Sequence, residues 1–132
     1  MTMDENQPFH ERSWVEKFRD AFRGMKAGVR GQSSFFVHFF IAAAVIATAA
    51  VLKIDSLAEW CLLLLCIAVV LTAEMFNSAL ESIARAITDQ HDPHIKAALD
   101  ISSAAVLIAS IGASLVGTLV FGKWFGTLVG WW

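Results

Sequence analysis

Three long runs of apolar residues follow one another along the chain. Phe35–Leu52 has 18 residues without Asp, Glu, Lys or Arg, residues 60–83 contain two carboxylates, and Ile101–Gly122 carries no charge. Each run is close to the length that a helix needs to cross a hydrocarbon layer of about 30 Å. Because lipid offers no water to backbone N–H and C=O groups, such segments must be helical. The pattern predicts an all-α membrane protein with three transmembrane helices, over residues 34–52, 56–86 and 93–122.

The residues before the first run have a different periodicity. Trp14, Phe18, Phe22, Met25 and Val29 recur at steps of three or four, while Lys and Arg mostly take the other faces. This spacing is typical of an amphipathic helix that lies in the membrane interface. We therefore expect a surface helix over residues 11–31, and one membrane domain that spans residues 1–132.

Composition supports this prediction and excludes several classes of protein. The chain is 57% hydrophobic and 17% charged, whereas a soluble domain is about 45–50% apolar and about 25% charged. This apolar composition excludes a disordered protein. A disulfide scaffold is excluded because Cys61 and Cys66 both lie in an apolar run. The net charge of −2 gives no basic field for nucleic acid.

The distribution of Lys and Arg predicts the orientation in the membrane. Six of these residues precede the first apolar run, and only Lys53 lies in the loop that follows it. Positive residues accumulate on the cytoplasmic side, so the N-terminus is expected there. The loop between the second and third runs is then cytoplasmic as well, and the tail from Lys123 is outside.

Capping signals mark two helix starts. Ser56 and Glu59 have the spacing of a capping box, which gives Glu59 a structural role. Asp92 followed by Pro93 is typical of an N-cap and a first-turn proline. The third helix is therefore expected to start in the cytoplasm.

Four polar residues interrupt the second run. Glu74, Asn77, Ser78 and Glu81 stand at i, i+3, i+4 and i+7, on one helical face. A carboxylate in a span costs about 2.5–3.5 kcal/mol and normally faces protein or water. Glu74 lies about 27 Å along the helix from its start, close to the cytoplasmic end. The deeper carboxylate can act as a base, and Glu81 can hold a Mg²⁺ that brings a nucleotide phosphate, with Asp100 as a further acid.

Other interpretations of the polar residues remain open at this point. The stripe can form hydrogen bonds between helices, or conduct protons or ions. His38 in the first span can serve packing, an interhelical hydrogen bond or chemistry. His91 and His94 can ligate a metal, or belong to a solvated loop.

The segment Glu74-Met-Phe-Asn-Ser-Ala-Leu-Glu81 resembles the E-x-x-N-[ST]-A-[IL]-E signature of the small prokaryotic diacylglycerol kinase family, which includes the undecaprenol kinases. The similarity covers about residues 17 to 123 and includes Ala21-Phe22-Arg23-Gly24, Phe35, His38, Glu59-Trp60, Asp92-Pro93, Lys96 and Asp100-Ile-Ser-Ser-Ala-Ala-Val-Leu107.

The resemblance implies an ATP-dependent lipid kinase of the bacterial inner membrane. It implies a homotrimer of three-span subunits that uses MgATP to phosphorylate the hydroxyl of undecaprenol or diacylglycerol at the cytoplasmic interface. Glu59-Trp60, Asp92-Pro93 and the ending Val116-Gly117…Val120-Phe121 look more like the undecaprenol kinase branch.

The resemblance also implies roles for single residues. Glu74 is expected to be the general base, Asn77 to position the lipid hydroxyl, and Glu81 to bind the metal that carries ATP. Asp100 and Lys96, with the loop that contains His91 and Asp92, are expected at the nucleotide.

Three positions depart from the family pattern. Gln32 stands where a second metal-binding Glu is usual, and an amide is a weaker Mg²⁺ ligand than a carboxylate. We still expect Gln32 at the metal and nucleotide. Leu99 replaces a common Lys, and Arg85 a common Asp. These changes leave an alternative, a catalytically impaired relative that acts as a trimeric membrane scaffold or nucleotide-sensing module.

Overall fold

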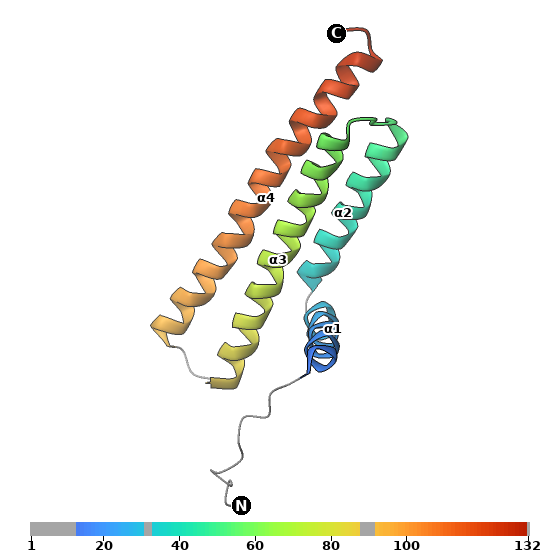
Figure 1. The fold of residues 1–132 in the computed structure, drawn as a ribbon. Coiled ribbons are helices and arrows are strands. Elements are labelled where there is room, and N and C mark those ends of the chain that lie inside the picture. Colours follow the sequence, from blue (N-terminus) through green and yellow to red (C-terminus); the bar gives the residue numbers. More distant parts are fainter. Residues whose placement is uncertain (1–12, 31–32, 88–91, 132) are drawn as a thin grey trace, which may run out of the picture.

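Four helices make up the described part of the protein. The computed structural model describes residues 13–30, 33–87 and 92–131, which form α1 (Trp14–Arg30), α2 (Ser33–Val51), α3 (Leu57–Ile87) and α4 (Pro93–Leu128). The last three run side by side in alternating directions, with α3 in the middle, and α1 lies beyond the first turn of α2 (Figure 1). The predicted all-helical fold is confirmed, with a separate helix ahead of three apolar ones.

The apolar surface of this bundle is largely uncovered. α3 and α4 are long and apolar enough to cross a membrane, yet only 11% and 6% of their most apolar stretches are buried within the chain. Exposed apolar surface of this extent needs lipid or another protein to cover it. The apolar part of α2, Phe35–Val51, has 17 residues, at the lower end of the range for a span. The structure thus supports two spans, and the third remains a prediction.

α1 starts with a capping box at Ser13 and Glu16. The Ser13 N–H donates to Glu16 Oε2 over 2.8 Å, and the Glu16 N–H donates to Ser13 Oγ over 3.3 Å. The helix therefore begins at Trp14, three residues after the predicted start. Trp14, Phe18 and Phe22 are all largely exposed on its apolar side. An uncovered apolar face is what a helix in the membrane interface presents to lipid.

The buried apolar core lies at the end of the bundle where α2 turns into α3. It consists of Ala49, Ile54, Leu63 and Val120, with Trp60 and other apolar residues packed around it. The Trp60 Nε1–H donates to the backbone oxygen of Ile54 over 3.0 Å, which fixes the turn. This end of the molecule therefore serves as framework.

Glu59 joins α3 to α4 at the same end. Its carboxylate accepts hydrogen bonds from Lys123 Nζ over 2.7 Å and from Trp124 Nε1 over 2.5 Å. The Glu59 N–H also contacts Ser56 Oγ at 3.4 Å, as an N-cap requires. The structural role predicted for Glu59 is confirmed, but its carboxylate is used between helices.

α4 continues to Leu128, six residues beyond the predicted end at Gly122. The helix is extended because Lys123 and Trp124, which follow Gly122, both donate hydrogen bonds to Glu59 of α3. The helix ends at Leu128, and the chain turns away at Gly130, whose φ of 77° suits glycine best. The Trp131 N–H then donates to the Gly126 oxygen over 2.9 Å, as in a Schellman motif.

Removal of the Glu59 carboxylate is expected to destabilise this end. Glu59→Ala deletes both hydrogen bonds to α4, so it should lower the melting temperature of the protein in detergent. Glu59→Gln keeps an acceptor for Trp124 and should lower it less. Asp55→Ala, which removes an exposed acid in the neighbouring turn, is the matched control. Equal melting temperatures for Glu59→Ala and Asp55→Ala would contradict the assignment.

Candidate functional site

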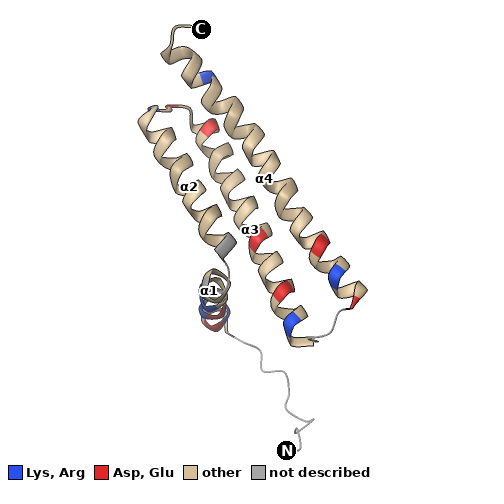
Figure 2. Cartoon of the chain, turned by 180° about the vertical axis from the view of Figure 1, so that it is seen from behind, with Lys and Arg blue, Asp and Glu red and all other residues tan. Residues whose placement is uncertain are grey.

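Apart from the Glu59–Lys123 pair at the opposite end, the charged residues of α3 and α4 lie in the half of the bundle nearer α1 (Figure 2). The polar stripe of α3 lies in this half: Glu74, Asn77 and Ser78 are buried, and the Glu81 side chain is 31% exposed. Three of the four side chains are therefore withdrawn from the lipid-facing surface. Burial of this kind is expected for polar groups that face protein in a span.

Glu74 is the most buried large side chain among the described residues, with an exposed fraction of 2%. An ionisable group in such surroundings needs polar partners. From α2, the His38 imidazole reaches toward it, with 3.9 Å between His38 Nε2 and Glu74 Oε2. The place of His38 in the first apolar run does not predict this contact, because it depends on how α2 packs against α3.

Asn77 is the centre of a hydrogen-bond network that joins α3 to α4. Its Oδ1 accepts from Ser102 Oγ over 2.7 Å, and from Ser103 Oγ over 3.4 Å. Its Nδ2 donates to Glu81 Oε1 over 3.0 Å. Both ends of the amide are thus held, and the amide in turn orients the Glu81 carboxylate. Ser102 was not among the predicted site residues; its only sequence signal was its place in the family-like segment after Asp100.

Ser78 lies on another side of the same helix. It lines a cavity of about 220 Å³ between α1 and α3, and its Oγ makes no hydrogen bond to the described residues. α1 comes close to α3 here, since a Cβ on Gly28 would stand 2.8 Å from Met75 Sδ. The predicted stripe is therefore divided: Asn77 bonds toward α4, and Ser78 faces α1.

Glu81 is a partly exposed carboxylate that could hold a cation. It is partly exposed at the end of the bundle, with Arg85 Nη1 at 3.7 Å. No cluster of three or more His, Cys, Asp or Glu occurs among the described residues. Mg²⁺ is usually held by one or two carboxylates together with substrate phosphates and water. A single half-exposed carboxylate fits that type of site.

The remaining predicted residues come from α4 and from segments outside the described ranges. Asp92 caps α4, accepting from the N–H groups of His94 and Ile95 at 2.8 and 3.0 Å, so the predicted N-cap is confirmed. Lys96 Nζ donates to Asp100 Oδ2 over 2.6 Å on the exposed side of α4. Gln32 and His91 lie outside the described residues.

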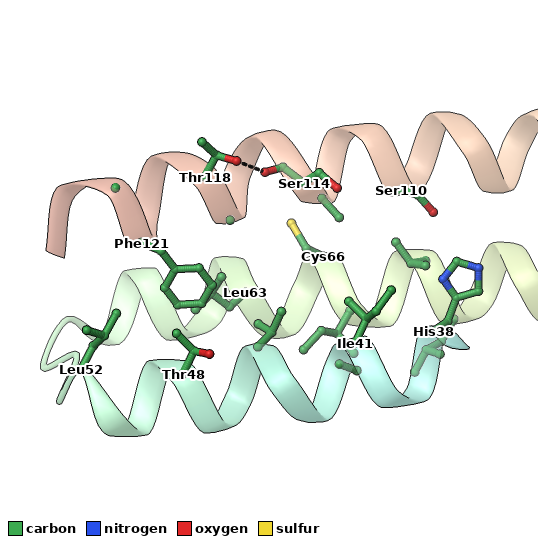
Figure 3. Close-up of a pocket in the computed structure, with 18 of the residues that line it drawn as sticks. His38, Ile41, Thr48, Leu52, Leu63, Cys66, Ser110, Ser114, Thr118 and Phe121 are labelled. Carbon is green, nitrogen blue, oxygen red and sulfur yellow. Dashed lines mark hydrogen bonds between the residues drawn. The ribbon is translucent and has the colours of Figure 1, made fainter. Parts of the chain in front are cut away.

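An apolar groove of about 790 Å³ is lined at one end by His38, the neighbour of Glu74. His38 stands at one end, and Leu52 and Phe121 stand toward the other (Figure 3). α2, α3 and α4 all contribute to its walls, which are mostly apolar: Ile41, Ala42, Val45, Leu63, Ile67, Val70, Leu71, Ala113 and Gly117 are among the residues that line it. A groove of this length and chemistry fits a hydrocarbon chain. Sequence periodicity did not predict it, because it depends on the separation of α2 from α4.

Known proteins resemble this chain over most of its length. Residues 19–121 match the family described as prokaryotic diacylglycerol kinase. An undecaprenol kinase of Bacillus subtilis is 31% identical over 108 residues, which is 82% of this chain and 87% of that protein. A diacylglycerol kinase of Synechocystis sp. is 31% identical over 118 residues, which is 84% of this chain and 67% of that protein.

The link between Ser102 and Asn77 is expected to stabilise the packing of α3 on α4. Ser102→Ala should lower the free energy of unfolding in detergent by about 1 kcal/mol, because it removes a buried hydrogen bond between helices. Ser103→Ala is the matched control, since its contact to the same oxygen is longer and more exposed. If both variants unfold alike, the short bond does not carry the stabilisation.

Proposed function

Because this chain belongs to the prokaryotic diacylglycerol kinase family and is a lipid kinase, we propose that it transfers the γ-phosphoryl group of MgATP to the hydroxyl of a membrane lipid alcohol. The observation that carries this proposal is the position of Glu74. Its buried carboxylate is 3.9 Å from the ring of His38, which lines one end of the apolar groove, and it lies about one helical turn before Asn77, whose amide bonds to Glu81. A lipid chain and a phosphate donor can therefore meet at one carboxylate.

The groove is the proposed site for the chain of the acceptor lipid. A hydroxyl placed at Glu74 leaves its hydrocarbon chain to run past His38 between α2 and α4 (Figure 3). Burial of that chain against apolar walls provides binding energy that is independent of the reacting group. Binding energy of this kind can be used to hold the hydroxyl close to its reaction partner.

Glu74 is proposed as the general base. Its Oε2 accepts the hydroxyl proton as the acceptor oxygen forms a bond to the γ-phosphorus, and the bond from that phosphorus to the β,γ-bridging oxygen breaks to release ADP. Asn77 is proposed to position the hydroxyl, and the bonds from Ser102 and to Glu81 keep its amide in place. Phosphoryl transfer depends mainly on such positioning and on neutralised charge.

Glu81 is proposed to hold Mg²⁺, with Gln32 as a further oxygen ligand. When bound, the metal would neutralise charge on the phosphates of ATP. His91, Asp92, Lys96 and Asp100 are proposed to contact the nucleotide. Support comes from the antiparallel course of α3 and α4, because Asp92, Lys96 and Asp100 stand at the start of α4 and Glu81 stands near the end of α3 (Figure 1).

We further propose a homotrimer of three-span subunits in the bacterial inner membrane, with the N-terminus in the cytoplasm. The uncovered apolar surface of α3 and α4 is consistent with cover by lipid and by other subunits. α1 and the start of α4 lie at the same end of the bundle (Figure 1). A cytoplasmic N-terminus would therefore bring the surface helix and the proposed nucleotide residues to one side of the membrane.

Both relatives are named as kinases, which does not favour the alternative of an inactive scaffold. The identity is 31% both to the undecaprenol kinase and to the diacylglycerol kinase, so the choice of acceptor rests on the groove. Three of the positions that resemble the undecaprenol kinases form contacts within the framework: Glu59, Trp60 and Asp92. Gly117 and Phe121 line the groove. One groove suits the single chain of undecaprenol, which we therefore favour as the acceptor.

Transfer of labelled γ-phosphate tests the proposal. We expect the purified protein to label undecaprenol in mixed micelles that contain both lipids and MgATP. Glu74→Gln should reduce turnover by about 100-fold or more, since it removes the proton acceptor and keeps the volume. The variant should keep the oligomeric state of the wild type. Preferential labelling of diacylglycerol would contradict the choice of lipid, and near-normal turnover of Glu74→Gln would contradict the general base.

Restoration of a carboxylate at position 32 tests the metal site. Gln32→Glu is expected to lower the Mg²⁺ concentration for half-maximal activity, because a carboxylate binds Mg²⁺ more strongly than an amide does. The measurement is a Mg²⁺ titration at saturating ATP and lipid. Gln7→Glu, which adds the same charge far from the site in sequence, is the matched control. An unchanged Mg²⁺ requirement for Gln32→Glu would remove Gln32 from the metal site.

A further inference from the structure

His38 occupies a position that the proposed chemistry has not yet used. Its side chain is 19% exposed, and its Nε2 lies 3.9 Å from Glu74 Oε2. The same ring lines the mouth of the apolar groove (Figure 3). His38 is therefore next to the proposed base and on the route of the acceptor lipid at the same time.

We propose that His38 is a positioning residue of the kinase reaction, whose imidazole holds the Glu74 carboxylate in the orientation that receives the proton of the acceptor hydroxyl. This inference rests on the proposed function of Glu74 as the base. It assigns to α2 a direct part in the site, in addition to its role as a wall of the groove.

The imidazole suits this task because it can donate a hydrogen bond from Nε2, whether the ring is neutral or protonated. A carboxylate that is only 2% exposed has little access to water, so polar neighbours determine its orientation. At 3.9 Å the two atoms are too far apart for a hydrogen bond. Catalytic contacts often shorten only when substrate is bound.

Glu74 is the charged residue that faces the His38 ring among the residues that the structure describes. Among the described residues, no ion pair of His38 other than that with Glu74 occurs. The groove offers the thiol of Cys66 from α3 and the hydroxyls of Ser110 and Ser114 from α4. These groups are neutral, so the carboxylate is the strongest acceptor for the ring.

Replacement of His38 tests the inference. His38→Phe keeps a ring without a donor, and should lower kcat for lipid phosphorylation by about 10-fold to 100-fold, the range expected for a misplaced catalytic group. The KM for ATP should not change, because the nucleotide is proposed to bind at other residues. His38→Gln places an amide N–H near the position of Nε2 and should recover most of kcat. His38→Leu provides a second donor-free variant if the larger ring does not fit.

A double variant separates positioning from packing. If His38 acts through Glu74, then Glu74→Gln with His38→Phe should be no slower than Glu74→Gln alone. Phe39→Leu, at an exposed neighbouring position of α2, is the control and should keep wild-type activity and melting temperature.

Three outcomes would overturn the inference: wild-type kcat in both His38→Phe and His38→Leu, an equal loss in His38→Gln and His38→Phe, or a further loss in the double variant. An active wild type with an inactive Glu74→Gln variant would leave the proposed function intact in each case. Absence of lipid labelling by the wild type would instead overturn the proposed function itself.

Discussion

The burial of a carboxylate inside an apolar helical bundle is the constraint on which the rest of this structure depends. Glu74 is 2% exposed, and a charge at that depth is costly unless protein groups surround it. α2 brings His38 toward it, and the network around Asn77 joins the adjacent turn of α3 to α4. Polar contacts at this depth thus involve all three helices, and hydrogen bonds join α3 to α4. In an apolar bundle without these polar groups, fewer contacts would favour one packing of the helices over another.

The two ends of the bundle differ, since one is held by packing and hydrogen bonds and the other contains the proposed site. One end contains the apolar core and the hydrogen bonds that the Glu59 carboxylate accepts from two residues of α4. The other end contains partly exposed charged groups, the approach of α1, and the start of the groove. Strong contacts far from the proposed site would leave the other end accessible to the proposed lipid and nucleotide. A lipid kinase needs such a separation, because its acceptor arrives from the membrane and its phosphate donor from water.

The organisation of the proposed site follows from the fold rather than from a dedicated binding loop. Helix α3 places Glu74 inside the bundle and Glu81 about two turns further, toward the exposed end. Neighbouring helices then supply what α3 lacks: His38 from α2, and Ser102 from α4. A phosphate-binding loop is unnecessary where one partly exposed carboxylate and a metal can neutralise the phosphates. In the proposed site, the same helix would serve both substrates at different depths.

Local sequence determined the helices, the polar face of α3 and the cap at Asp92, because apolar runs, helical spacing and capping residues act over a few neighbouring positions. It also carried the family signature between Glu74 and Glu81. The extension of α4 beyond Gly122, the contact of His38 with the carboxylate, the bond from Ser102 and the groove were decided only by tertiary structure. Each of them depends on the distance and rotation between helices that are far apart in the chain. Those quantities are set by side-chain packing, which no periodicity along one helix contains.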